Sequence, residues 1–317
     1  MSLQLGDLIF DKPVILAPMS GITDYPFRTL VKKLGANLLI SEMIASRAMI
    51  AQTNKSMRKA QVDELTAVQL AGCDPVIIAE AAKLNEDMGV KIIDINFGCP
   101  VKKVVNGYAG AALMCDEKKA SEIIASVVQS VKIPVTLKMR TGWNAQRLNA
   151  TKIAKIAEDL GIQMITVHCR TREQFYTGSV DWTFVKKIKE VVKIPIIVNG
   201  DIRTISDIKE SLAQSSADGI MIGRGIYGKP WFIHQAINFL SQSEIYEPTN
   251  LEKLNIILEH YDHILEFYGK NIGVKIAKKH IGWYSMGIHD SSIFRAKINS
   301  MYDFLEIKDN ILAFFSR

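Results

Sequence analysis

Eight short apolar runs recur along the first part of the chain, and each is followed by a segment of helical period. The runs are rich in Val, Ile and Leu and lack polar alternation, which is typical of parallel strands buried on both faces. They read PVILAPM (13–19), NLLISEM (37–43), LTAVQLAG (65–72), KIIDINF (91–97), IPVTLKM (133–139), IQMITVH (162–168), IPIIVNG (194–200) and ADGIMIG (217–223). Helical patterns lie between them, as at 75–89, 117–131 and 149–161.

Eight strand–helix units in roughly 240 residues favour a (β/α)8 TIM barrel. The alternative, a doubly wound open sheet, would more often carry a glycine-rich turn after its first strand; here that position reads Ala17-Pro18-Met19-Ser20. After Leu240, the polar stretch SQSEIYEPTN (241–250) resembles a linker, and the remaining chain is helical in period. The sequence therefore predicts an α/β barrel domain at 1–240 and a small all-helical domain at 241–317.

The composition excludes several classes of protein. Hydrophobic residues make up 48% and charged residues 23% of the chain, which excludes bulk disorder, and no apolar stretch is long enough to span a bilayer. The four cysteines form no CxxC pair, which argues against a disulfide framework and a zinc site. His260 and His263 lack a third ligand and are interpreted as a helix face. We therefore expect a cytoplasmic monomer without a metal or a membrane partner.

Polar residues gather where the eight apolar runs stop, and in such barrels the active site lies at the carboxyl ends of the strands. The residues are Ser20, Glu42, Gln69, Asn96, Cys99, Lys138, Arg140, His168, Arg170, Asn199, Gly200, Asp201, Gly223, Arg224 and Gly225. Each alone could be a satisfied polar group at a strand end. Eight such ends together would destabilise a domain that binds no ligand, because buried polar groups need partners.

A glycine-rich turn follows the eighth run, in the segment GRGIYGKP (223–230). A P-loop is excluded because Pro230 has no hydroxyl group, and a dinucleotide fingerprint is excluded because no strand follows within a βαβ unit. With Asn199-Gly200-Asp201, this turn predicts the phosphate site that barrels place on their last two loops, with Arg224 neutralising the charge. A plain tight turn remains the alternative for the glycines.

Gln69, Lys138 and His168 indicate what the phosphate belongs to. An amide can match the donor–acceptor edge of a pyrimidine-like ring, and a lysine can stabilise negative charge on a reduced ring. A phosphorylated flavin meets these demands, whereas a sugar phosphate leaves Gln69 unexplained.

The segment DINFGCP (94–100) presents a cysteine at the active face. Gly98 relaxes the backbone before Cys99, and Pro100 fixes the exit of the loop. Such a thiol could be a nucleophile or a proton donor, and the absence of an adjacent histidine favours the donor. The loop that follows, at 101–113, is long enough to act as a lid.

Basic residues are concentrated near the end of the chain, which carries a net charge of +6 from 39 basic and 33 acidic residues. The stretch 270–297 holds one acid, Asp290, and six basic residues: Lys270, Lys275, Lys278, Lys279, Arg295 and Lys297. With its interleaved aromatic residues, this stretch is either an electrostatic footprint for nucleic acid or a solvated helix face.

Several blocks of the sequence resemble those of the tRNA-dihydrouridine synthases, most closely the bacterial B-type branch. They are APMSGITDYPFR (17–28), DINFGCPVKKV (94–104), LKMRTGW (137–143), VHCRTREQ (167–174), VNGDI (198–202) and MIGRG (221–225). The segment KIAKKHIGWY (275–284) is similar to the family's helical-domain motif. The chain departs from the pattern at Cys169, where the family usually has glycine.

The resemblance implies an FMN-dependent enzyme that uses NADPH, or NADH, to reduce the C5=C6 bond of uridines in tRNA. The reaction places a hydride from flavin N5 on C6 and a proton from Cys99 on C5. The residues implied around FMN are Pro18, Met19, Ser20, Gln69, Lys138, His168, Asn199, Gly200, Asp201, Gly223 and Arg224. Those implied toward the uracil or the tRNA are Asn96, Arg140, Arg170, Arg172, Lys275, Lys278, Lys279 and Arg295, with Arg170 and Arg172 approaching FMN or RNA.

Two other functions stay open from the sequence. One is a flavin oxidoreductase acting on a free pyrimidine, similar to the dihydroorotate dehydrogenases, although a small substrate needs no appended basic domain. The other is an RNA-binding scaffold without catalysis, although a pure binding protein has no use for a thiol at the barrel mouth.

Overall fold

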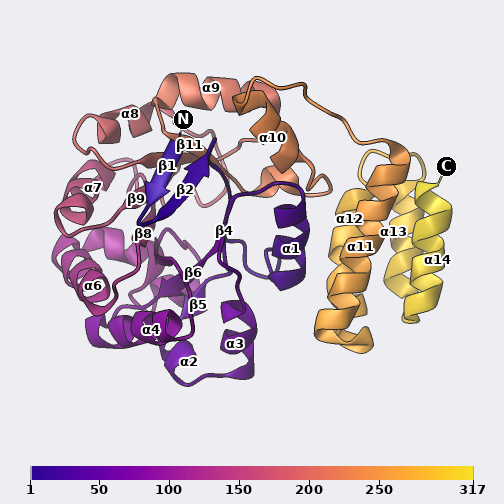
Figure 1. Ribbon diagram of the computed structural model, residues 1–317, viewed down its shortest axis with the longest axis horizontal. Helices are drawn as coiled ribbons and strands as arrows, with labels where there is room; N and C mark the ends of the chain where they lie inside the picture. Colours follow the sequence, from indigo (N-terminus) through magenta and orange to yellow (C-terminus); the bar gives the residue numbers. More distant parts are fainter. Residues whose placement is uncertain (1, 317) are drawn as a thin grey trace. The chain divides into compact units, whose positions relative to one another are not determined.

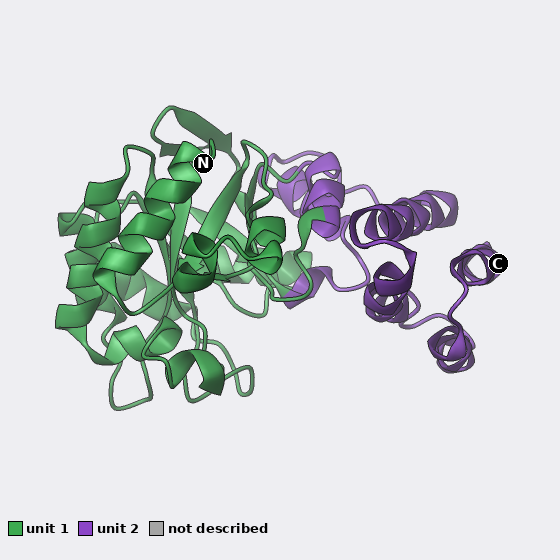
Figure 2. Cartoon of the chain, turned by 90° about the horizontal axis from the view of Figure 1, so that it is seen from below, with its two compact units in different colours: residues 1–25, 36–223 green, residues 26–35, 224–317 purple. Residues whose placement is uncertain are grey.

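The computed structural model describes residues 2–316, and the chain forms two compact units (Figure 2). The first unit comprises residues 1–25 and 36–223, and the second comprises residues 26–35 and 224–317. The second unit thus begins at Arg224 and also takes in a segment from the early part of the chain. The assignment of catalysis to 1–240 and RNA binding to 241–317 stays a prediction.

Eight parallel strands close into a barrel in the first unit, which confirms the predicted TIM barrel (Figure 1). The strands are β3 (Val14–Leu16), β4 (Leu38–Ile40), β6 (Thr66–Ala71), β7 (Ile93–Phe97), β8 (Val135–Arg140), β9 (Met164–His168), β10 (Ile196–Asn199) and β11 (Gly219–Ile222). β3 pairs with β11 on one side and with β4 on the other, and a pairing of β4 with β6 completes the ring. All eight strands lie within the predicted apolar runs, except that β8 continues by one residue to Arg140.

Helices on the outside of the barrel begin at side chains that cap their free N–H groups. The Asp74 carboxylate accepts from Val76 and Ile77 at the start of α4, and Thr204 and Asp207 form a capping box at the start of α9. The helices of this unit are α2 (Ser46–Ile50), α3 (Asn54–Ala60), α4 (Pro75–Asp87), α5 (Lys102–Val105), α6 (Glu117–Ser130), α7 (Ala150–Asp159), α8 (Thr183–Lys189) and α9 (Ile205–Ser215). The short strand β5 (Ile44–Ala45) extends the sheet beside β6, and the 3-10 helix η1 covers Gly110–Cys115.

A two-stranded antiparallel hairpin, β1 (Ser2–Leu5) and β2 (Leu8–Asp11), precedes the barrel and is absent from the strand predictions. Its buried residues Leu3, Leu5 and Phe10 belong to one apolar cluster with residues from across the barrel, among them Ile15, Leu38, Ala67, Ile92, Met164, Ile197 and Met221. The hairpin turns at Gly6, whose φ of +57° favours glycine.

The second unit is helical, as the period of the sequence predicts. Its helices are α1 (Tyr25–Lys33), which starts in the first unit, α10 (Phe232–Leu240), α11 (Asn250–Tyr268), α12 (Lys270–Tyr284), α13 (Ser291–Ser300) and α14 (Phe304–Phe315), with the short 3-10 helix η2 at Arg224–Ile226. Buried apolar residues of α11 to α14 form a shared core, in which Phe294 stacks on Phe314 at 3.9 Å between ring centroids.

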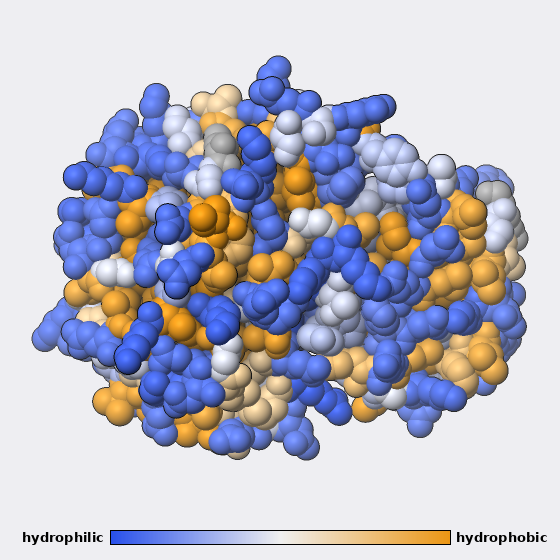
Figure 3. Space-filling view, viewed as in Figure 1, coloured by the Kyte–Doolittle hydropathy of each residue, from blue (hydrophilic) through white to orange (hydrophobic). Residues whose placement is uncertain are grey.

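The surface shown in Figure 3 is mostly hydrophilic, with smaller apolar areas scattered over it. Between residues 2 and 316, none of the helices combines the length and the apolar character that crossing a membrane requires.

Candidate active site

The carboxyl ends of neighbouring strands bring predicted polar residues side by side. In the register of the sheet, Asn96 on β7 lies beside Lys138 on β8. His168 on β9 lies beside Asn199 on β10. Gln69 on β6 lies beside Asp94 on β7, one position before the last pair of residues in that register. Because parallel strands of a barrel end at the same face, these residues share one end of the barrel.

A buried hydrogen-bond network links three of these strands. Asn96 Nδ2 donates to Gln69 Oε1 at 2.8 Å, and Gln69 Nε2 donates to Asp94 Oδ2 at 2.7 Å. The Thr136 hydroxyl donates to the other oxygen of Asp94 at 2.6 Å. Burial raises the pKa of Asp94 to about 6, against these hydrogen bonds, which lower it. The network fixes the amide of Gln69 while leaving it a second N–H to donate and a second lone pair to accept with.

The Cys99 loop is held by the side chain at the end of β7. Asn96 Oδ1 accepts hydrogen bonds from the backbone N–H groups of Gly98 and Cys99, at 3.1 and 2.9 Å. The Cys99 carbonyl accepts from Ala111 at 3.0 Å. Gly110 packs against the same loop with a φ of +61°, and a Cβ there would lie 2.8 Å from the Cys99 carbonyl oxygen. The thiol is therefore presented by a fixed backbone.

The electrostatic surroundings keep the Cys99 thiol protonated. Burial raises its pKa above the usual range of a cysteine, while the Val101 N–H, Arg140 and Lys138 favour the thiolate and lower it. A protonated thiol with cations nearby suits a proton donor, because the thiolate left behind is stabilised.

Lys138 places a buried cation at the mouth of the barrel. Its Nζ donates to Asn199 Oδ1 at 3.2 Å, and the Asn199 amide in turn donates to the carbonyl of Met221 at 2.8 Å. Burial and the neighbouring Arg140 together lower the pKa of Lys138 to about 8, although the negative charge of Asp94 acts in the opposite direction. The hydrogen-bond partner of this ammonium group is thus a neutral amide.

Arg140 is buried and ties two loops to the end of β8. Its Nε donates to the Gly98 carbonyl at 2.8 Å, and its Nη1 donates to the carbonyls of Thr171 and Phe175, each at 2.8 Å. The guanidinium group, implied by the resemblance to face the substrate, therefore holds the Cys99 loop and the loop after β9 together.

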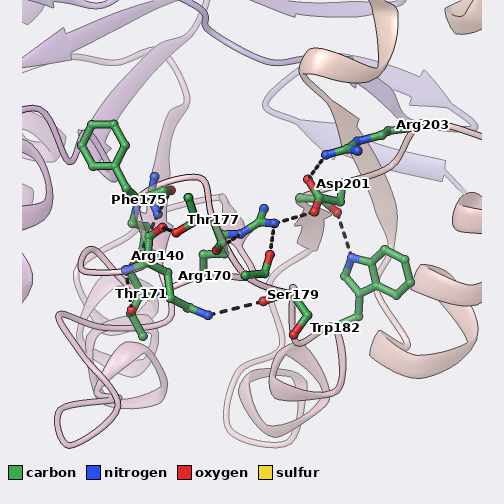
Figure 4. Close-up of polar contacts among 12 residues, drawn as sticks. Arg140, Arg170, Thr171, Phe175, Thr177, Ser179, Trp182, Asp201 and Arg203 are labelled. Atoms are coloured by element: carbon green, nitrogen blue, oxygen red, sulfur yellow. Dashed lines mark hydrogen bonds and ion pairs between the residues drawn. The ribbon is translucent and has the colours of Figure 1, made fainter.

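Arg170 lies beside the turn after β10 and is also buried (Figure 4). Its Nη2 donates to Asp201 Oδ2 at 2.5 Å and to the Gly178 carbonyl at 2.6 Å, while its Nη1 is a buried donor without a partner among the described residues. Arg203 donates to the other oxygen of Asp201 at 2.9 Å. The two arginines together hold the pKa of Asp201 below its usual range, against the effect of its burial.

Gly200 adopts a backbone conformation that only glycine tolerates well. Its φ is +126°, and a Cβ there would lie 2.9 Å from Val180 Cγ1 and 3.1 Å from His168 Cδ2. The Gly200 carbonyl accepts from the indole of Trp182 at 3.0 Å (Figure 4). The Asn199-Gly200-Asp201 turn is therefore fixed on both sides.

The loop after β3 lies against the end of β11. Ala17 N–H donates to the Ile222 carbonyl at 2.9 Å, and a Cβ at Gly223 would lie 3.7 Å from Met19 Sδ. Pro18 and Ser20 flank Met19 in this loop. Arg224 follows Gly223 directly in the chain and begins η2.

Tyr176 belongs to the same end of the barrel, although the sequence alone did not single it out. Its ring lies 6.3 Å from the His168 ring between centroids, and the Arg140 guanidinium carbon lies 5.5 Å from its centroid. Phe175, at a φ of +53°, contacts Tyr176 edge to face. An adjacent pair of aromatic residues in EQFY (173–176), close behind the end of a strand, is the signal that could have found it.

Cys169 and Arg172 both pack within the first unit. Cys169 is buried, its N–H donates to the Asn199 carbonyl at 2.9 Å, and burial raises the pKa of its thiol to about 12. The residue that departs from the family pattern is therefore an inert part of the barrel wall. The guanidinium carbon of Arg172 lies 4.7 Å from the centroid of the Trp143 ring.

The basic residues implied for tRNA lie on two helices of the second unit. Lys275, Lys278 and Lys279 belong to α12, and Arg295 belongs to α13. Lys275 is exposed, whereas Lys278 Nζ donates to the Asn299 carbonyl at 2.9 Å and Arg295 lies 3.5 Å from the Ser285 hydroxyl. Lys278 and Arg295 therefore also link parts of this unit.

Comparison with known proteins places the chain in a family. The family model described as Dihydrouridine synthase (Dus) matches residues 15–317. A "Probable tRNA-dihydrouridine synthase" of Rickettsia bellii (strain RML369-C) is 55% identical over 319 residues, covering 99% of this chain and 98% of its own. A "tRNA-dihydrouridine synthase B" of Xanthomonas axonopodis pv. citri (strain 306) is 44% identical over 301 residues, covering 94% of this chain and 91% of its own.

These matches confirm the resemblance found in the sequence blocks, including the similarity to the B-type branch. They extend over the barrel and the helical segment alike, with the Cys99 loop inside the matched range. The chain therefore belongs to the dihydrouridine synthase family.

Proposed function

We propose that this enzyme reduces the C5=C6 bond of uridines in tRNA, giving 5,6-dihydrouridine. The observation that carries the proposal is the Cys99 thiol, which burial keeps protonated on a loop fixed by Asn96 at the catalytic end of the barrel. Membership of the family supports the choice of uridine as the reacting base.

The cofactor that the residues fit is FMN. Lys138 provides a buried ammonium group whose hydrogen-bond partner is neutral, which suits the charged edge of a reduced ring. Arg170 Nη1 is a buried donor without a partner beside the Gly200–Asp201 turn, which suits a phosphate or another anion. We propose that the residues named above as FMN contacts hold it, and that NADPH is its reductant, with NADH as the alternative.

When bound in its reduced form, FMN would supply the hydride for C6 of the uracil. The residues of the chain control the proton. The Cys99 thiol donates its proton to C5, and Lys138 and Arg140 stabilise the resulting thiolate, since both favour the charged form of Cys99. Asn96 keeps the thiol in place through the two backbone N–H groups of its loop.

A base inside a stack cannot reach the mouth of a barrel, so the target nucleotide has to leave its stack. Such access is easiest in a loop of the tRNA, where bases are already partly unstacked. We propose that the basic residues of α12 and α13 contact phosphates of the tRNA. We also propose that the enzyme is a monomer and acts in the cytoplasm.

The test is an anaerobic half-reaction. The purified protein is reduced with NADPH, unmodified tRNA is added, and the return of the oxidised flavin absorbance is followed. Rapid reoxidation by that tRNA, but not by orotate or by tRNA that already carries dihydrouridine, supports the proposal. Reoxidation by orotate alone would assign the enzyme to free pyrimidines. A protein that binds no FMN would leave only the scaffold function.

A further inference from the structure

A pocket of about 620 Å³ lies in the first unit, beside the end of β6 and the segment that follows Cys99. Its volume lies within the usual range for small-ligand sites, about 300–1,000 Å³. It is lined by residues of α2, α3 and α5, by the end of β6 and by the start of α4. The side chains in it that carry charge are Arg47, Lys55, Lys59, Asp74 and Lys103.

The pocket shares a wall with the Cys99 loop. Val104 lines the pocket, and its Cγ1 would lie 3.0 Å from a Cβ at Gly110, the residue that packs against Cys99. On the other side, β5 pairs with Leu70 and Ala71, which directly follow Gln69 in β6. The pocket therefore lies next to the Cys99 loop and the end of β6, within the same unit.

Four basic side chains face one carboxylate in this pocket, which gives it a net positive charge. Lys59 is held in place, with its Nζ 3.0 Å from the Met43 carbonyl and 3.3 Å from Glu42 Oε1, and Arg47 lies 3.6 Å from Asp74. Lys55 and Lys103 are exposed and have no hydrogen bond or ion pair within residues 2–316. An anionic ligand can therefore form ion pairs with both ammonium groups without displacing another protein group.

We propose that this pocket binds the sugar–phosphate backbone of the tRNA strand next to the uridine that Cys99 protonates. The inference rests on the proposed function. A nucleotide that leaves its stack carries the neighbouring phosphates with it, and their charges need cations close to the barrel mouth. The cations here stand on three separate short helices, which suits several phosphates along a strand better than one isolated phosphate.

The apolar part of the lining suits the rest of a nucleotide. Ile44, Ile77 and Val104 contribute aliphatic side chains between the cations. Aliphatic surface of this kind packs against a ribose or the face of a base, where no charge has to be neutralised. A nicotinamide dinucleotide shares the phosphate chemistry and is the occupant that the experiment has to separate from RNA.

The experiment compares the double variant Lys55→Glu/Lys103→Glu with Lys209→Glu, which reverses an exposed lysine on α9, far from α2 and α3 in the same unit (Figure 1). Flavin content and thermal unfolding establish that each variant is folded. The rate of flavin reduction by NADPH is then measured, followed by kcat and KM with tRNA and by direct tRNA binding, between 50 and 200 mM salt. The neutral pair Lys55→Gln/Lys103→Gln provides a milder second variant.

We expect the double reversal to raise KM and Kd for tRNA about tenfold or more at the lowest salt, with flavin reduction and kcat unchanged. The slope of log K against log salt should fall by about 0.7 for each lost phosphate contact, as for a single strand. The neutral pair should give a smaller loss, and Lys209→Glu none.

Two results would overturn the pocket as an RNA site. One is tRNA binding and KM equal to those of the unchanged protein, and the other is a defect confined to reduction by NADPH. A failure of the proposed function is distinguishable, because the unchanged enzyme would then bind tRNA without forming dihydrouridine. In that case, weaker tRNA binding by the double variant still supports the pocket.

Discussion

The position of the Cys99 thiol depends on contacts made by the backbone of its loop. Asn96 fixes the backbone of the loop, and the conformation of Gly110 lets the next segment close over it. Burial then keeps the proton on sulfur. Removing the thiol alone should leave this scaffold unchanged, so chemistry and binding can be separated at this residue.

Cys99→Ala is expected to keep its flavin and to lose dihydrouridine formation by about 10²- to 10⁴-fold, the usual contribution of a general acid. Flavin absorbance of the purified variant and mass spectrometry of digested tRNA measure the two effects. Cys99→Ser, which keeps a weaker acid at the same place, is the matched control. Full activity of the alanine variant would exclude Cys99 as the acid.

A side chain at Gly200 should weaken flavin binding as well as stability. Its Cβ would meet Val180 and His168, and a positive φ in a non-glycine residue costs about 1–3 kcal/mol. Gly89 serves to measure the loss of stability alone, because its φ is also positive, at +92°, but a Cβ there meets no atom within 4 Å. We expect Gly89→Ala to lower the melting temperature and keep the flavin content, and Gly200→Ala to lower both. Equal flavin content in the two variants would contradict this reading of the turn.

At the scale of elements, α11 and α12 pack through a pair of buried histidines. His260 Nδ1 lies 3.0 Å from the Tyr284 hydroxyl, and the rings of His260 and His280 are 4.7 Å apart between centroids. Burial lowers the pKa of His260 to about 3 and holds that of His280 well below its usual range, and the neighbouring charges of His263 and Lys279 act in the same direction. Both rings are therefore neutral in the folded unit.

This pair predicts that the second unit loses stability in acid. A histidine whose pKa is lowered by folding stabilises the fold above its unfolded pKa, about 6.5, and this stability is lost as the pH falls from there toward the folded value. The loss is about 1.4 kcal/mol per pH unit for each histidine. Hydrogen exchange of peptides from α11 and α12, referenced to peptides from β7 and β8, measures it between pH 7 and pH 5.

His280→Phe keeps a ring that can stack on Phe27, whose centroid lies 5.6 Å from that of His280, and removes one titrating group. We expect this variant to show about half of the pH dependence. If its pH dependence equals that of the unchanged protein, buried histidines are not its cause.

The sequence predicted those elements whose pattern is set by burial alone. The eight barrel strands lie within continuous apolar runs because both of their faces are covered. The β1–β2 hairpin was missed because each of its strands spans four residues with one covered face, a pattern too short to stand out. His260 was interpreted as part of a helix face, because period alone does not show that Tyr284 and His280 enclose it.

The candidate site was predictable to the same extent. Polar residues such as Asn96 and Lys138 stand out because they end apolar runs. The parts played by Asp94, Thr136 and Tyr176 depend on partners brought in by the fold, from 25 to 42 positions away for the two bonds of Asp94. No local signal reports the two partners of Asp94, whereas the adjacent aromatic pair in EQFY (173–176) could have indicated Tyr176.

At the scale of the whole molecule, positive charge occurs in both units, on α12 in one and around the pocket in the other. If α12 contacts RNA, Lys275→Glu should weaken tRNA binding and lower its salt slope by about 0.7, with no change in flavin content. Lys275 is the cleanest probe because it is exposed, whereas Lys278 also bonds to Asn299. Lys118→Glu, at an exposed position of α6, is the control, and equal effects of the two reversals would indicate nonspecific charge.

The closure of the barrel has a consequence for how the chain folds during synthesis. β3 leaves the ribosome among the first strands, but its partner β11 ends at Ile222. The apolar cluster of the hairpin ahead of β3 is likewise incomplete until Met164, Ile197 and Met221 have been synthesised. Because such distant pairings form slowly and leave apolar surface uncovered, the nascent barrel stays open until β11 has been synthesised and depends on protection from aggregation during that time.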